Sequence, residues 1–157
     1  MIFATLLYIK NPAGDYLLIE RLKEPNKGFL SPPGGKILVA DGESPAECAV
    51  REANEECGLI SSVTDWKYIG LITEKAYPKI GDIMIFCYKY RGLILSLPEK
   101  STEGHFSFVK PEDIPMSKIP DTDKLYIWKF VLRNTDNFFS IYIDCSNNEI
   151  KCRVEQE

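Results

Sequence analysis

Histidine is almost absent from this chain of 157 residues, which contains one, His105. A single histidine cannot form the histidine clusters that bind transition metals, and we expect His105 to be a surface or loop residue. No apolar run approaches the roughly 18 residues that a membrane-spanning helix needs, so we expect no membrane partner. Basic residues are also too few for a non-specific nucleic-acid binder, because 19 Lys and Arg face 23 Asp and Glu, a net charge of -4. We therefore expect no stable nucleic-acid partner.

Cysteine is present but not in the patterns of a disulfide framework or a zinc site. The number is odd and the chain has no Cys-x-x-Cys pair; the five cysteines are Cys48, Cys57, Cys87, Cys145 and Cys152. Residues 1–10 are apolar, but they lack the basic segment and small-residue cleavage site of a signal peptide. Together these features predict a protein of the reducing cytoplasm.

The order of apolar runs and turn residues predicts one domain over residues 1–157, which is long enough for a substantial core. Antiparallel hairpins are predicted at both ends of the chain, with helices between. This mixture indicates an α+β fold, an α/β/α sandwich around a mixed sheet. The expected strands are 2–10, 16–22, 66–74, 82–90, 105–109, 138–144 and 150–154, and the expected helices are 45–57 and 121–133.

The first helix has unusually complete signals at both of its ends. Ser44 is a candidate N-cap, Pro45 suits the first helical position, and Glu47 completes a capping box. Gly58 is a natural C-terminal stop. One apolar stripe at helical spacing predicts packing on a sheet; its members are Ala46, Ala49, Val50, Ala53 and Cys57.

The second helix has weaker signals. Asp121 or Thr122 is expected to cap its N-terminus. The apolar stripe predicted for this helix consists of Leu125, Trp128, the stem of Lys129, and Leu132.

Three glutamates, Glu52, Glu55 and Glu56, project together from the first helix because residues three and four apart share a helix face. Like charges on one face repel each other, and a divalent cation would turn that repulsion into attraction. Hard cations such as Mg²⁺ prefer oxygen ligands and are usually bound by a few carboxylates together with substrate phosphates. The cluster therefore predicts a metal site for phosphate chemistry.

The chain resembles the Nudix hydrolases, through the Gly34–Gly35 pair, Glu43, and the segment ArgGluAlaAsnGluGluCysGlyLeu at 51–59. From Glu43 onward the family's motif is matched at every fixed position. The segment from 36 to 42 departs from it, because seven residues separate Gly35 from Glu43 where the family pattern has five. A short insertion in a loop costs little free energy, so the metal site is expected to survive it.

The resemblance implies that Glu52, Glu55 and Glu56 hold Mg²⁺ or Mn²⁺, with the Gly35 carbonyl as a further ligand. It also implies that Arg51 orients a glutamate through a charge-assisted hydrogen bond. The metal would activate a water molecule for attack on a diphosphate and neutralise the charge that develops on the phosphate oxygens.

The resemblance leaves open which residue removes the proton from the attacking water. Glu52 and Glu103 are both candidates. Glu43 is expected to accept from Arg51 or to act at the metal, although the insertion before it makes its position the one to check.

Outside this motif, the chain is similar to Nudix hydrolases of the oxidised-purine nucleoside triphosphatase type. That similarity implies that Ser31 and Asp121 contact a purine edge and that the Gly34 backbone approaches the substrate. Ser31, Thr122 and Ile119 replace an asparagine, a second acid and a tryptophan of those enzymes. Asp121 has a second reading as a simple helix cap.

Three functions follow as hypotheses. The first is a Mg²⁺-dependent nucleoside triphosphate pyrophosphohydrolase, with an oxidised purine such as 8-oxo-dGTP as the favoured substrate. The second is a hydrolase of RNA 5′ ends or of dinucleoside polyphosphates. The third is a Nudix-fold binding module without turnover. The expected partner is a nucleotide or another nucleoside diphosphate-linked small molecule, and the sequence leaves the oligomeric state open.

Overall fold

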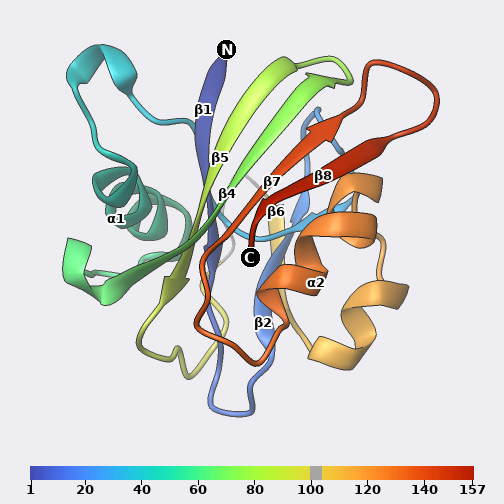
Figure 1. Cartoon of the computed structure of the whole chain (residues 1–157). Helices are drawn as coiled ribbons and strands as arrows, with labels where there is room; N and C mark the ends of the chain where they lie inside the picture. Colours follow the sequence, from blue (N-terminus) through green and yellow to red (C-terminus); the bar gives the residue numbers. More distant parts are fainter. Residues whose placement is uncertain (100–103) are drawn as a thin grey trace.

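Two β-sheets lie at the centre of the fold, and helices cover the larger sheet from both sides (Figure 1). The computed structural model describes residues 1–99 and 104–157. The α+β class and the sandwich predicted from the sequence are confirmed. No helix in this described part of the chain has the length and apolar character needed to cross a membrane.

The larger sheet has five strands in the order β1-β5-β4-β7-β8. It is mixed, because β1 pairs with β5 and β4 with β7 in parallel, whereas the β4–β5 and β7–β8 pairs are antiparallel. The β7–β8 hairpin predicted at the C-terminal end is therefore confirmed. The strands are β1 (Ile2–Tyr8), β4 (Trp66–Tyr77), β5 (Gly81–Tyr90), β7 (Phe139–Asp144) and β8 (Lys151–Gln156).

The smaller sheet has three antiparallel strands in the order β3-β2-β6. They are β2 (Tyr16–Arg21), β3 (Leu30–Ser31) and β6 (Gly104–Val109). The hairpin predicted for the first two strands is wrong, because β1 and β2 lie in different sheets. A backbone bond from the Leu17 N–H to the Ile9 carbonyl (2.9 Å) and an isolated Lys10–Tyr16 bridge remain between the segments. The chain crosses from one sheet to the other at this point.

Helix α1 (Pro45–Cys57) forms where its local signals predict. The Ser44 side chain accepts from the Glu47 N–H and the Glu47 carboxylate accepts from the Ser44 N–H, which completes the capping box. Gly58 ends the helix in the left-handed conformation (φ 63°), where glycine carries no penalty. The predicted small-residue stripe packs against the five-stranded sheet, with Ala49 and Ala53 fully buried.

The second helical region is irregular. A π-helical turn, η4 (Asp123–Ile127), runs directly into the short helix α2 (Trp128–Val131). The Trp128 N–H bonds to the Asp123 carbonyl, five residues back, which widens the turn. The stripe predicted from regular helical spacing is therefore wrong at Leu125, which is 54% exposed. The buried side chains of this region are Thr122, Asp123, Ile127, Trp128 and Phe130.

Three short 3₁₀ turns complete the described elements: η1 (Val39–Asp41), η2 (Val63–Asp65) and η3 (Pro111–Met116).

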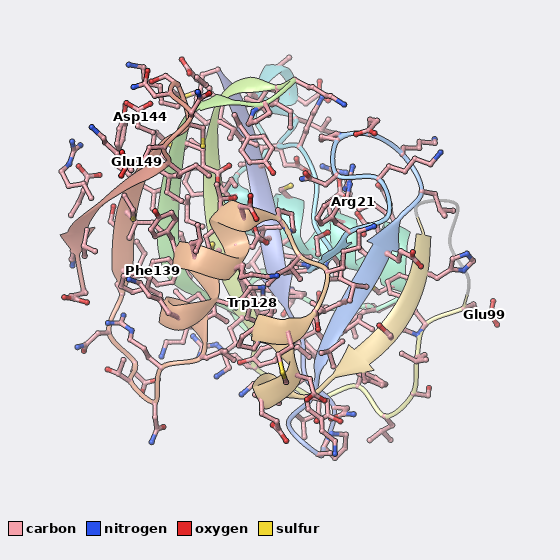
Figure 2. The ribbon with its side chains drawn as sticks, turned by 90° about the vertical axis from the view of Figure 1, so that its right-hand side faces the viewer. Arg21, Glu99, Trp128, Phe139, Asp144 and Glu149 are labelled. Carbon is pink, nitrogen blue, oxygen red and sulfur yellow. The ribbon has the colours of Figure 1, made fainter. Side chains whose placement is uncertain are left out.

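Two apolar cores hold the layers together. One lies between α1 and the five-stranded sheet, and the other lies between that sheet, the smaller sheet and α2. In Figure 2, Trp128 lies at the centre of the view, with Phe139 toward the five-stranded sheet and Arg21 on the smaller one. The Trp128 ring packs edge-on against Tyr8 of β1 and Tyr16 of β2, so it joins both sheets.

Candidate active site

Arg51 is the centre of a hydrogen-bonded group between α1 and the segment from Lys36 to Glu43. Its Nε and Nη2 donate to the two carboxylate oxygens of Glu43 at 2.6 and 3.0 Å. Its Nη1 donates to Glu52 at 2.7 Å and to Glu55 at 3.2 Å, and Nη2 also reaches the Lys36 carbonyl at 3.0 Å. One guanidinium therefore orients three glutamates: Glu52 and Glu55 on the same helix, and Glu43 in the segment before it.

Glu43 lies in this group in spite of the longer segment before it. The additional residues form the exposed 3₁₀ turn η1, and Gly42 closes that turn in the left-handed conformation (φ 71°). The Leu38 N–H donates to the Glu43 carboxylate at 2.8 Å, which ties the start of the turn to its end. The insertion thus projects into solvent and leaves the Arg51–Glu43 pair intact.

The Gly34–Gly35 loop packs against both β1 and the Glu52 carboxylate. The Thr5 N–H donates to the Gly35 carbonyl at 2.9 Å. A Cβ added to Gly35 would lie 2.3 Å from a Glu52 carboxylate oxygen, and one added to Gly34 would lie 2.1 Å from the Thr5 carbonyl oxygen. Both distances are shorter than any van der Waals contact, so a side chain at Gly34 would collide with the Thr5 backbone and one at Gly35 would displace the Glu52 carboxylate. The loop therefore brings bare backbone against Glu52.

The charges of this group stabilise one another. The hydrogen bonds from Arg51 lower the pKa of Glu43, and the Leu38 N–H acts in the same direction. The Glu43 and Glu52 carboxylates in turn raise the pKa of Arg51 further above its ordinary value. Burial raises the pKa of the neighbouring Cys48 thiol to about 11, so this cysteine stays protonated and inert at neutral pH. Arg51 and Glu43 are both charged at neutral pH.

The donor set suits a hard cation, although no three acidic, cysteine or histidine side chains of residues 1–99 and 104–157 stand close enough to hold one as placed. Arg51 occupies the space between Glu52 and Glu55. The Glu55 side chain is 58% exposed, so its carboxylate can turn without creating a buried unpaired charge. Glu52 and the Gly35 backbone are already adjacent, and all of these donors are oxygens.

A cavity of about 430 Å³ adjoins the Gly34–Gly35 loop. Ser31 and Gly34, two of the predicted substrate contacts, line it together with Gly35. Its walls are mainly apolar, through Ile2, Leu6, Ile83 and Ile85 of the five-stranded sheet, and the smaller sheet contributes Arg21 and Ser31. The volume is in the range of small-molecule sites.

Two buried acids that sequence reasoning missed also line this cavity: Glu74 of β4 and Asp123 of η4. Glu74 is 3% exposed and Asp123 is 8% exposed. Burial raises the pKa of Glu74 to about 8, with a further contribution from the Asp123 charge, and burial raises the pKa of Asp123 to about 7. Strongly perturbed acids in a cavity are typical of functional sites.

The predicted contact Asp121 is placed differently. It is exposed and, among the described residues, it is not one of those that line the cavity. The π turn buries Asp123 instead, two residues further along. The other candidate base, Glu103, lies outside the described residues.

Comparisons with known proteins agree with this fold. The NUDIX domain profile matches residues 2–129. The structure resembles that of a mutator MutT protein from Bacillus halodurans, with a TM-score of 0.80 and 22% identity over 99% of this chain and 98% of the other. It also resembles a MutT protein from Methanosarcina mazei Go1 (TM-score 0.67, 25% identity, 82% and 88% covered). A third neighbour is the Caenorhabditis elegans Ap4A hydrolase (TM-score 0.61, 18% identity, 83% and 95% covered).

The chain belongs to the NUDIX domain family. It is a hydrolase of phosphoanhydride bonds that acts on nucleoside diphosphate-linked substrates, and hydrolases of this family generally use a divalent metal such as Mg²⁺.

Proposed function

We propose that this protein is a Mg²⁺-dependent nucleoside triphosphate pyrophosphohydrolase that releases a nucleoside monophosphate and pyrophosphate. The observation that carries the proposal is the Gly34–Gly35 loop, which contacts the Glu52 carboxylate and lines the 430 Å³ cavity. A nucleoside in the cavity would have its phosphate chain directed past this loop toward α1. The catalytic group and the binding space are thus parts of one site.

In this proposal Glu52, Glu55 and Glu56 hold Mg²⁺ or Mn²⁺ with the Gly35 carbonyl. The metal lowers the pKa of a water molecule and neutralises charge on the phosphates. Arg51 holds Glu43 and Glu52 in fixed orientations, and Glu43 keeps the guanidinium in place through two bonds. Of the two candidate general bases, Glu52 is the one within the described residues, and its carboxylate lies against the Gly35 backbone.

The chemistry of the cavity supports a nucleobase as the occupant. Its apolar walls fit a flat heterocycle, and Glu74 and Asp123 offer it hydrogen bonds. Because burial raises the pKa values of both acids, one of them can be protonated at neutral pH. A protonated carboxyl donates and an ionised carboxylate accepts, so the pair is complementary to a base edge that has a donor beside an acceptor.

Oxidised purines such as 8-oxo-dGTP are the favoured substrates in this proposal, because oxidation of guanine at C8 places an N7–H donor beside the O6 and O8 acceptors, where unmodified guanine has acceptors alone. The Ser31 hydroxyl, which lines the same cavity, is a further polar contact. Asp121, being exposed outside the cavity, has no part in base contact in this arrangement.

The test is a substrate screen of the purified protein with Mg²⁺, using normal and oxidised nucleoside triphosphates, dinucleoside polyphosphates and 5′-triphosphate RNA. We expect the highest kcat/KM with an oxidised purine triphosphate, and pyrophosphate as a product. A clear preference for dinucleoside polyphosphate or RNA would replace the proposed substrate class. Tight binding of these compounds without turnover would favour the binding module.

A further inference from the structure

A second cavity, of about 390 Å³, lies at the opposite end of the five-stranded sheet from the candidate active site. It is formed by the start of β4 and the end of β5, whereas the first cavity lies at the end of β4 and the start of β5. The segment after α2 closes it, and the two cavities share no lining residue among those described.

Positive charge dominates the lining of this second cavity. Lys67, Lys89, Arg91 and Arg133 line it, against one acid, Asp136. The protein as a whole carries a net charge of -4, so the concentration of cations at this place is not a consequence of composition. Asp136 neutralises Lys67 through a 2.8 Å ion pair and leaves the other three cations without a carboxylate among the described residues that line the cavity.

The cations are held close enough to repel one another. Lys67 and Lys89 are directly opposite in the β4–β5 register, an arrangement that destabilises a sheet. Lys10, next to this pair, has its pKa lowered by burial and by the Lys89 ammonium. A structure that keeps such neighbours gains when an anion enters between them.

Arg133 adds an incompletely bonded guanidinium. Its Cζ lies 4.8 Å from the centre of the Phe130 ring. Its Nη1 donates a long hydrogen bond, of 3.4 Å, to the Glu157 carboxylate. Its Nε and Nη2 are buried and have no acceptor within residues 1–99 and 104–157. Buried polar groups without partners are rare, and an absent ion or water is one physical explanation. The incompletely bonded guanidinium, whose one carboxylate contact is long, attracts an anion in the cavity beside it.

We propose that this second cavity is a binding site for a small phosphate-bearing anion, held by Lys67, Lys89, Arg91 and Arg133 and separate from the hydrolytic site. A phosphate group suits the cluster because its several oxygens can accept from several cations at once. The Thr135 and Asn137 side chains in the same lining are further donors. The volume admits more than one phosphate group, which extends the class to pyrophosphate and nucleoside monophosphates.

The test uses backbone amide NMR of the whole protein in EDTA, which removes divalent metals and so weakens phosphate binding at the hydrolytic site. Inorganic phosphate, pyrophosphate and a nucleoside monophosphate are titrated separately. We expect saturable shifts at 67–69, 89–91 and 133–137, and the tightest of the three ligands identifies the natural source of the phosphate group. The absence of saturable shifts at these residues with all three ligands would overturn the proposal.

Variants sharpen the test. Lys89→Gln should weaken binding of the tightest ligand about tenfold, the effect of losing one charge-assisted hydrogen bond. Lys124→Gln is the matched control, because Lys124 is exposed, lies outside the lining and carries the same charge. Equal weakening by the two substitutions would show that the anion is attracted only by the overall charge of the protein, and would overturn the proposal. Arg133→Gln is a second variant, and Glu55→Gln should leave this binding unchanged.

Discussion

At the scale of single residues, Arg51 has contacts that only a guanidinium can make. It donates to Glu43, Glu52, Glu55 and the Lys36 carbonyl from three nitrogens. Lysine has one ammonium and cannot hold this fork geometry. We predict that Arg51→Lys lowers kcat at least about tenfold while circular dichroism shows the fold retained. Unchanged kcat would show that alignment of the glutamates does not limit the reaction.

The two loop glycines predict different outcomes for the same substitution. In Gly35→Ala the new methyl group meets the flexible end of Glu52, which can move aside, so we expect activity to fall with little change in melting temperature. In Gly34→Ala the methyl group meets the Thr5 backbone, which cannot move cheaply, so we expect a clear loss of stability. Parallel measurements of kcat/KM and melting temperature check this. Full activity of Gly35→Ala would show that the position of the Glu52 carboxylate does not matter for catalysis.

The buried Glu74 leads to a prediction about the pH dependence of stability. Burial raises its pKa to about 8 in the folded protein, so its contribution to stability is fully present below the unfolded pKa and is lost as pH rises through about 8. The same direction holds for Asp123. The other titratable groups that line this cavity are Arg21, Lys36, Lys79 and Tyr77. The charges of the two acids contribute to the raised pKa values of Tyr8, Cys87 and Cys145 nearby.

We therefore expect Glu74→Gln to flatten the fall in unfolding free energy between about pH 4.5, the ordinary pKa of a glutamate, and about pH 8, as measured by denaturant titration. Glu112→Gln, at an exposed position, is the control and should leave the slope unchanged. A wild-type protein whose stability rises across this range would contradict the assignment of raised pKa values.

The site residues of α1 were predictable because their signals are local, whereas Glu74 and Asp123 come together only in the folded chain. Glu74 had one signal in the sequence. It stands in phase with Gly70 and Ile72, the buried positions of β4, so a charged residue was due to face inward. Asp123 had no signal in the sequence, since regular helical spacing does not predict a π turn.

At the scale of elements, α1 was predicted to the residue, but the first hairpin was not. Caps and a helical stripe are set within about fifteen residues, whereas strand partners are chosen by long-range pairing. Leu7, Tyr8 and Ile9 are all nearly fully buried. Such a continuous apolar run is typical of a strand covered on both faces, as in parallel pairing, rather than of an alternating hairpin strand.

The exposed turn η1 gives a prediction at this scale. Deleting Val39 and Ala40 would bring the segment before Glu43 to the family's usual length. Because the turn is exposed and Arg51 holds Glu43 directly, we expect kcat/KM to stay within about threefold of the wild type. A loss as large as that of Glu43→Gln would mean that the turn itself positions Glu43 or closes over the substrate.

At the scale of the whole molecule, the two cavities at opposite ends of the five-stranded sheet differ in their charges. The buried acids Glu74 and Asp123 line the first cavity together with Arg21, Lys36 and Lys79, whereas four cations line the second against one acid, Asp136. The glutamates of α1, next to the Gly34–Gly35 loop, repel a polyphosphate, and in the proposed function a divalent cation offsets that repulsion.

The central claim is metal-dependent hydrolysis by the glutamates of α1, and product analysis of wild type against Glu55→Gln tests it most directly. The account predicts that the wild type releases a nucleoside monophosphate and pyrophosphate from an oxidised purine triphosphate only when Mg²⁺ is present. Glu55→Gln should reduce this rate about a hundredfold or more, without a change in melting temperature, because Glu55 is largely exposed. Equal rates for the two proteins, or no Mg²⁺-dependent product, would contradict the account.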